Sequence, residues 1–165
     1  MTDRAGNPDD QRNESATGRV AARPEDVFDL ITDVRRLPEW NVQIPRVLHA
    51  PARLTEGAEW VVVQRGIAPG LQWNSRARVI ELDRAGLRFG YRSCSDDGNP
   101  SYATWTWQLS PADGETKVSV QRELHPETFW RRVLFSRIRH RQLRSELRTS
   151  IEAMQRVLAI RRETR

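Results

Sequence analysis

The stretch of residues 101–124, SYATWTWQLSPADGETKVSVQREL, contains two runs in which bulky apolar side chains alternate with polar ones. A period of two is typical of β-strands that bury one face. Ala112-Asp113-Gly114 separates the two runs, and a short loop containing Asp and Gly is typical of a hairpin. We therefore predict two antiparallel strands, over residues 101–110 and 116–124.

The same periodicity extends toward the N-terminus as far as Ile44, with turn signals at hairpin intervals. It predicts four more strands, near residues 44–50, 58–66, 71–83 and 86–94. A weaker strand candidate, residues 15–22, precedes them. Connections this short favour an antiparallel meander, since a parallel crossover needs about a dozen residues or more. The prediction is one curved antiparallel sheet of seven strands.

Helix signals lie on both sides of the meander. Pro24, followed by two acidic residues, favours a helix start, and apolar residues recur at spacings of three and four through Ile31. Asp33 is a good N-cap for a second short helix, which Pro38 is expected to end at Leu37. In the last segment apolar residues recur at three and four in an arginine-rich background, which predicts one long helix over 127–160.

This order of elements, and particular stretches within it, resembles the helix-grip fold of the START-like superfamily (SRPBCC), specifically its bacterial polyketide cyclase/dehydrase and lipid-transport branch. The likeness covers about residues 15–160, and its most specific stretches are RPEDVFDLITD at 23–33, LPEWN at 37–41 and RSELRTSI at 144–151. It implies an α+β domain in which the sheet and the C-terminal helix enclose a cavity for a lipid, polyketide or aromatic molecule. It leaves open whether the protein is a polyketide cyclase/dehydrase or a non-catalytic carrier.

Alternation assigns one face of each strand to the interior, and bulky aromatic rings gather on that face. Such a lining suits a planar, largely apolar ligand, although the rings could equally fill the core and leave no space. Arginines at the opposed positions indicate an outer, solvated face. The residues predicted to contact the ligand are Trp60, Val62, Gln64, Trp73, Phe89, Tyr91, Trp105 and Trp107 from the sheet, with Val133, His140 and Leu147 from the helix.

His140 is the first candidate for acid–base chemistry, since it lies seven residues from both Val133 and Leu147 on the predicted inner stripe of the helix. A histidine that faces an apolar chamber can transfer a proton near neutral pH, although such residues more often have a structural role. Tyr91 is the second catalytic candidate. Tyr102 and Gln64 are further polar candidates for ligand contact.

Composition excludes several kinds of site. Cys94 is the only cysteine, so no intrachain disulfide or multi-cysteine zinc site can form, and three scattered histidines make a poor metal set. No HExxH, P-loop or GxGxxG pattern occurs, so we predict neither a metal nor a cofactor. No stretch approaches the ~20 apolar residues of a membrane span. The sequence indicates a cytoplasmic protein with a disordered leader over 1–14 and a basic tail over 161–165.

Positive charge is concentrated near the C-terminus. Residues 131–165 carry eleven arginines against three glutamates, a net charge of +8, whereas the whole chain has +5. Such a helix could dock on an acidic partner or a membrane surface, which is the alternative to the ligand-binding role, or it could simply be a solvated face. Nucleic-acid binding is disfavoured because no recognition motif occurs and the tryptophans are predicted to be buried. The oligomeric state is left open, a homodimer included.

Overall fold

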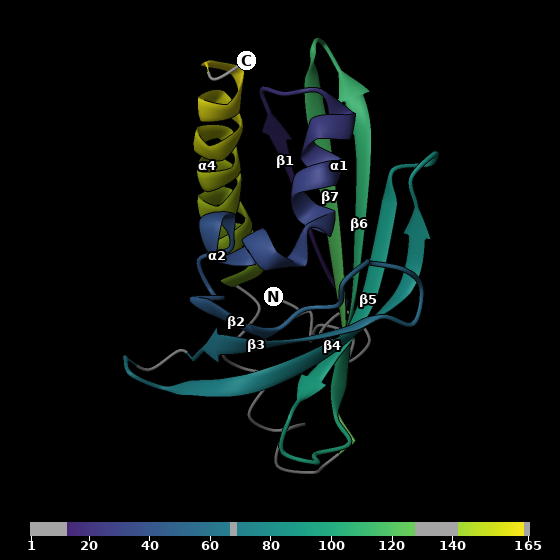
Figure 1. Cartoon of the computed structure of the whole chain (residues 1–165), viewed down its shortest axis with the longest axis vertical. Coiled ribbons are helices and arrows are strands. Elements are labelled where there is room, and N and C mark those ends of the chain that lie inside the picture. The colour runs from purple at the N-terminus through teal and green to yellow at the C-terminus, as the bar shows by residue number, and fades with distance from the viewer. Residues whose placement is uncertain (1–12, 67–68, 128–141, 164–165) are drawn as a thin grey trace, which may run out of the picture.

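The structure is a computed structural model and describes residues 13–66, 69–127 and 142–163. The described strands form the predicted seven-stranded antiparallel sheet (Figure 1). Their order is β1-β7-β6-β5-β4-β3-β2, so β1 pairs with β7 at one edge. The elements follow the chain as β1 (Asn13–Val20), α1 (Pro24–Thr32), the 3-10 helix η1 (Val34–Arg36), α2 (Leu37–Trp40), β2 (Arg46–His49), β3 (Glu59–Arg65), β4 (Gln72–Asp83), β5 (Arg88–Ser95), β6 (Tyr102–Ala112), β7 (Glu115–His125) and α4 (Gln142–Glu163).

The turn of the β6–β7 hairpin fixes the register between these two strands. Asp113 and Gly114 have φ angles of 51° and 80°, and Ala112 pairs with Glu115 across the turn. Two successive residues with positive φ are typical of a type I′ turn, whose twist matches that of the flanking strands. The hairpin predicted from the sequence is therefore present, and its tight turn sets which side chains of β6 and β7 lie opposite each other.

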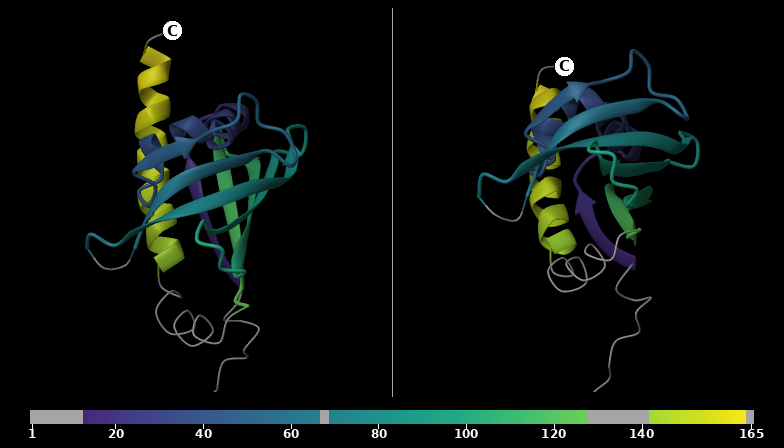
Figure 2. Two further views of the ribbon diagram at one scale, coloured as in Figure 1. Left: turned by 60° about the horizontal axis from the view of Figure 1, so that its bottom comes forward. Right: turned by 90° about the horizontal axis from the view of Figure 1, so that it is seen from below.

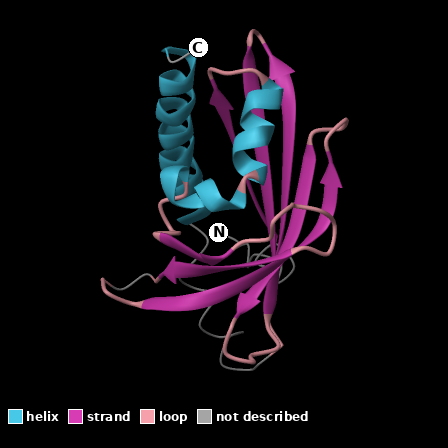
Figure 3. Ribbon diagram, viewed as in Figure 1, coloured by secondary structure: helices cyan, strands magenta, loops and turns pink. Residues whose placement is uncertain are grey.

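Two bulges bend the sheet. The register shifts between Val79 and Glu81 on β4 and between Val47 and His49 on β2. An extra residue on one strand bends that strand and increases its twist. The result is a curved sheet in which β3 and β4 run across the direction of β6 and β7, with the helices on the concave side (Figures 1 and 3). These described elements make up the predicted helix-grip arrangement.

The first helix begins as the sequence predicts, and the second does not. Pro24 opens α1, whose buried side chains are the predicted apolar ones. Asp33 makes no side-chain capping bond, and η1 rather than an α-helix follows it. The helix α2 starts at Leu37, where the sequence prediction ended, and Pro38 lies in its first turn. A proline is tolerated there because the N–H that it lacks would have no partner within the helix.

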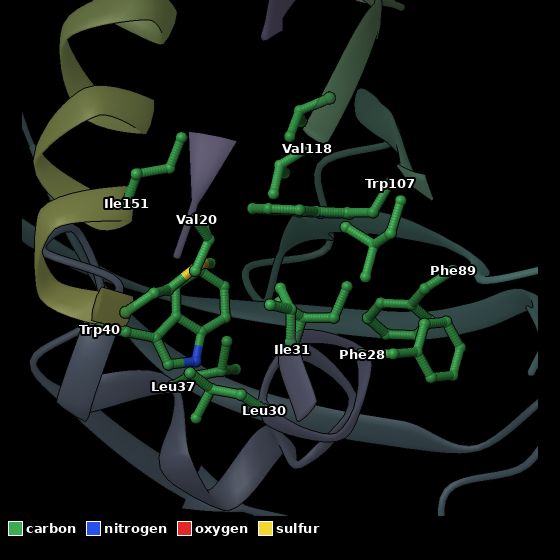
Figure 4. Packing of buried hydrophobic residues seen from close by; sticks show 14 of the residues in the cluster. Val20, Phe28, Leu30, Ile31, Leu37, Trp40, Phe89, Trp107, Val118 and Ile151 are labelled. Atoms are coloured by element: carbon green, nitrogen blue, oxygen red, sulfur yellow. The ribbon is translucent and has the colours of Figure 1, made fainter. Parts of the chain in front are cut away.

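The main core fills the space between the helices and the concave face (Figure 4). Trp40 of α2 meets Trp107 of β6 edge to face, with ring centroids 5.6 Å apart. On the other side α4 packs on β1 so closely that a Cβ atom at Gly18 would lie 1.9 Å from Ile151 Cδ1. In the left view of Figure 2, the C-terminal end of α4 extends past the strands.

Several predicted boundaries need correction. Strand β1 begins at Asn13, so Asn13 and Glu14 belong to the sheet rather than to the predicted leader. Helix α4 continues to Glu163, past the predicted end at residue 160. The first part of the predicted long helix, residues 128–141, lies outside the described residues.

Candidate ligand-binding site

Strand register determines which side chains lie on the concave face. Trp60 of β3 is opposite Ala77 of β4. Tyr91 of β5 is opposite Trp105 of β6, which in turn is opposite Arg122 of β7. Directly opposed residues of an antiparallel pair point to the same side of the sheet. These side chains therefore share the face that the helices cover.

Aromatic rings on this face form a connected series, which we call the aromatic wall: Trp60, Phe89, Tyr91, Trp105 and Trp107. The centroid of the Tyr91 ring lies 5.1 Å from Trp60, 5.4 Å from Phe89 and 6.1 Å from Trp105. The planes of Tyr91 and Trp105 are only 16° apart, so these two rings stack. Pairs with such spacing attract beyond their area burial, by about 0.5–1.5 kcal/mol each. The wall is thus a rigid surface rather than a set of independent rings.

Burial divides the aromatic wall into two parts. Trp60, Phe89 and Trp107 are 2–5% exposed and belong to the core cluster, as does Val62. Tyr91 and Trp105 are only half-buried and pack against the edge of that cluster. A ligand on the concave face would therefore meet Tyr91 and Trp105 first.

A buried ion pair lies beside the accessible rings. Arg122 Nη2 donates a hydrogen bond to Glu14 Oε2 across the β1–β7 pair, and the two side chains are 5% and 6% exposed. The Arg122 guanidinium also lies over Trp105, 5.3 Å from the ring centroid. Removing two charges from water has a large desolvation cost, which good geometry only partly repays. Such a pair is therefore weak support for stability and suggests a role on this face.

The Tyr91 phenol is held in its neutral form. Burial raises its pKa well above the ordinary range, and this outweighs the hydrogen bond with Trp107 and the positive charge of Arg122, both of which lower it. An indole N–H only donates, so the Tyr91 oxygen accepts from Trp107 and the phenolic proton remains to be donated. At physiological pH Tyr91 can act as a hydrogen-bond donor or a weak acid, but not as a base.

Trp105 is oriented by its neighbour on β5. Its Nε1 donates a 3.1 Å hydrogen bond to Ser93 Oγ. With the Tyr91 ring stacked on it and the guanidinium of Arg122 close by, the indole is positioned from three sides. The orientation of the Trp105 indole is therefore well defined.

The remaining predicted site residues are distributed differently. Gln64 and Trp73 oppose each other near the far ends of β3 and β4 and are half-buried. Leu147 of α4 is 5% exposed and belongs to the core cluster. Val133 and His140 lie outside the described residues, so their predicted roles stay predictions.

Tyr102 is not on the concave face, so the structure does not bring it together with the other predicted ligand contacts. Ala103 and Trp105 lie on the concave face of β6, and successive side chains of a strand point to opposite faces. Tyr102, which precedes Ala103, therefore points to the convex side. There it stacks on His125, with centroids 4.3 Å apart, and the Arg92 guanidinium lies 3.5 Å above its ring.

Sequence reasoning missed both members of the ion pair. Arg122 has the same parity as Val118 and Val120 in β7, which are fully buried, so alternation alone could have assigned it to the interior. Glu14 was assigned to the leader, and only its pairing with Arg122 reveals its place. An arginine in an alternating strand is easily assigned to solvent by residue type, because charged residues are rarely buried unless paired.

Two surface grooves lined by described residues lie away from the aromatic wall. One, of about 620 Å³, runs between β1 and α4 and is lined by Arg19, Arg144, Arg148 and Ile151 among others. The second, of about 570 Å³, lies beside α1 and includes Asp29 and Arg84, which form a 2.7 Å ion pair. Both are open surface features.

The ionisable groups that the strands place on the concave face are Glu14, Tyr91 and Arg122. This set can bind, orient and polarise a ligand, whereas a base other than Glu14 would have to come from another part of the chain. Within the described residues, no group of three or more metal-binding side chains occurs. Of the helices that the structure describes, none combines the length and hydropathy of a transmembrane segment.

A family model described as "Polyketide cyclase / dehydrase and lipid transport" matches residues 14–159. The chain therefore belongs to this family, and the START-like resemblance seen in its sequence is confirmed. The match begins at Glu14 and includes Arg122. No curated protein matches the chain.

Solved structures share the fold at low sequence identity. A protein from Rhodobacter sphaeroides aligns with a TM-score of 0.71 and 17% identity, covering 91% of this chain and 93% of that one. CV1439 from Chromobacterium violaceum aligns with a TM-score of 0.68 and 20% identity, covering 88% and 96%. DynU16, from the dynemicin biosynthetic locus, aligns with a TM-score of 0.61 and 18% identity, covering 90% of this chain and 47% of its own.

Proposed function

We propose that this protein binds a small, largely apolar and planar ligand between the concave face of the sheet and α4. The carrying observation is that Tyr91 and Trp105 stack as a rigid pair and remain only half-buried, while the rings behind them belong to the core. A flat apolar molecule gains dispersion and stacking on such a surface at little cost in side-chain entropy. Membership of a family described by cyclases, dehydrases and lipid transport supports the same role.

The same site is proposed for cyclase/dehydrase chemistry, with Tyr91 and His140 as the groups that handle protons. A neutral Tyr91 phenol suits a donor to a carbonyl or leaving oxygen. A flexible chain folded against the aromatic wall would gain mainly from restricted orientation. Catalysis is supported if His140→Gln retains ligand binding but loses turnover. If the protein is a carrier, this substitution should change its ligand binding little.

Direct ligand binding is tested with the neutral fluorophore N-phenyl-1-naphthylamine and with native mass spectrometry of the protein as purified. Trp105→Ala is expected to weaken fluorophore binding on the order of tenfold, since one stacking surface is lost. Tyr102→Ala is the matched control, because it removes a ring from the convex face. Equal affinities for the two variants, or no fluorophore binding by the wild type, would refute the proposed site.

A second role, docking on an acidic partner or anionic membrane, is favoured by one observation. Arg144 and Arg148 of α4 line the groove beside β1, together with Arg19, and the side chain of Arg148 is 85% exposed. Arg148 forms an ion pair with Glu152 at 3.7 Å, and the Glu152 side chain is itself well exposed, so this surface is accessible to an anion. Salt-sensitive binding to vesicles rich in anionic lipid, lost in Arg144→Gln/Arg148→Gln, supports this role, and its absence counts against it.

A further inference from the structure

The accessible end of the concave face is organised as a single transverse row. Each member of this row lies directly opposite the next on the neighbouring strand: Tyr91 of β5, Trp105 of β6, Arg122 of β7 and Glu14 of β1. Adjacent strands are about 4.8 Å apart, so the row places Arg122 next to Trp105 and within two strands of Tyr91. The charged pair therefore adjoins the surface on which the ligand is proposed to stack.

The Arg122 guanidinium has a buried N–H group, on Nε, that nothing in the described part of the chain satisfies. Nη2 donates to Glu14 and the flat face lies over Trp105, but Nε is buried and has no hydrogen-bond partner. Buried donors are paired in the great majority of cases, and an unmet one is costly, more so on a charged group. Because the side chain is only 5% exposed, bulk water does not provide the missing acceptor.

Trp40 Nε1 is the other described buried nitrogen without a partner, and its setting is different. It belongs to α2 and lies among Leu30 and Leu37 in the packed core (Figure 4). Arg122, in contrast, lies beside the half-buried Trp105. Of these two nitrogens, only that of Arg122 therefore belongs to a side chain in contact with a half-buried ring of the concave face.

The neighbouring hydroxyl groups also have donors to offer. Ser93 Oγ accepts from Trp105, and the Tyr91 oxygen accepts from Trp107, so each oxygen already serves as an acceptor and retains its own proton. The polar groups around Trp105 thus include several donors. A complementary ligand would supply an oxygen that accepts.

Charge decides which kind of oxygen fits. Glu14 already balances the positive charge of Arg122, so the pair is neutral as a unit. A ligand carboxylate would add a second negative charge next to Glu14 in a region of low dielectric, which is strongly unfavourable. An uncharged carbonyl accepts a hydrogen bond without this cost.

We propose that the ligand of this site carries an uncharged carbonyl oxygen, which accepts a hydrogen bond from Arg122 Nε while its planar body lies against Trp105. This inference rests on the proposed ligand-binding function and narrows its ligand class from apolar molecules in general to planar ketones. In this assignment Arg122 determines specificity, and Glu14 positions Arg122 by holding Nη2.

The inference is tested with two planar probes that differ only at one position, 9-fluorenone and fluorene, by isothermal titration. Hydrogen bonds from charged groups predict that the wild type binds fluorenone about ten- to a hundredfold more tightly than fluorene. In Arg122→Met/Glu14→Leu, which removes both charges together, the affinity ratio is expected to fall close to one. The matched control is Arg88→Met/Glu81→Leu, which removes an exposed Arg–Glu pair whose atoms are 2.9 Å apart and should leave the ratio unchanged.

The possible outcomes distinguish a failure of the carbonyl assignment from a failure of the proposed ligand-binding function. If neither probe binds the wild type, the proposed function fails. If both bind equally, the site stands but the carbonyl assignment is overturned, with a buried water as the partner of Nε. Tighter binding of 9-fluorenone-4-carboxylate than of fluorenone would overturn the charge argument.

A second measurement needs no variant, in case the double substitution does not fold. The C=O stretching frequency of fluorenone bound to the wild type is expected to lie below its value in an apolar solvent, because a hydrogen bond from a guanidinium polarises the carbonyl. An unshifted band from bound fluorenone overturns the inference by itself.

Discussion

Replacing Arg122 by Met removes the positive charge next to the buried Glu14 carboxylate, and we expect this single change to destabilise the fold strongly. At an effective dielectric constant of about 20, two unit charges about 4 Å apart interact by about 4 kcal/mol. Breaking buried pairs by removing one partner costs about 3–5 kcal/mol. Both side chains here are at most 6% exposed, so this buried-pair range applies.

The double variant Arg122→Met/Glu14→Leu is the decisive comparison. Replacing both members of a buried pair by apolar residues of similar size is often neutral or even stabilising by about 1–4 kcal/mol. The single variant should therefore be far less stable than the double variant, even though the double variant carries more substitutions. This reversal distinguishes a charge effect from the loss of packing.

Urea unfolding followed by tryptophan fluorescence measures the difference. With an m-value of about 2 kcal/mol per molar urea, the midpoint should fall by roughly 1.5–2.5 M in Arg122→Met and largely recover in the double variant. A single variant within about 0.5 M of the wild type, or a double variant no more stable than the single one, would refute the reasoning.

Three further predictions concern packing, titration and backbone strain. Gly18→Ala should lower the free energy of unfolding by about 1–3 kcal/mol, because the added Cβ would meet Ile151 Cδ1. Ile151→Val removes that atom and should restore part of the lost stability in a double-mutant cycle measured by thermal unfolding, whereas purely additive effects would contradict the contact. The pKa of Tyr91 is raised in the folded state, so its contribution to stability is complete below pH ~10 and is lost as pH rises further. In urea titrations between pH 9 and 11, the wild type should therefore lose more stability than Tyr91→Phe. Parallel curves for the two proteins would argue against burial of the phenol. Gly114→Ala, at a φ of 80°, should cost about 1 kcal/mol or more in the same assay, whereas Asp113→Asn should be nearly neutral, and a neutral Gly114→Ala would rule out the type I′ turn.

The periodicity and turn residues of the sequence predicted the fold well, because strand and turn formation depends mainly on residues close together in the chain. Alternation in β6 and the Asp113-Gly114 turn specify a hairpin without help from the rest of the chain. The same alternation assigned the aromatic wall to one face. The error at Pro38 has the same origin, because a proline disfavours the helical conformation of the residue before it but is tolerated in the first turn of a helix. Where α2 begins depends on burying Leu37 and Trp40, which is a tertiary effect.

The candidate site was only partly visible in the sequence. Tyr91 and Trp105 were found, since each lies in a clear alternating strand. Glu14 was not, because a polar N-terminal segment gives no sign of which strand it will join. Tyr102 was assigned by residue type rather than by parity, and its contacts with His125 and Arg92 place it on the other face.

The amino-acid sequence by itself determined the order of strands and helices, the turns between them and the face on which the aromatic rings gather. Each of these follows from periodicity and backbone preferences within a few residues of chain. Only the tertiary structure decided that Glu14 would meet Arg122, 108 residues further along the chain, and that this pair would adjoin Trp105. The reason is that strand register across β1 and β7 is a property of the closed sheet, and neither residue carries local information about its partner.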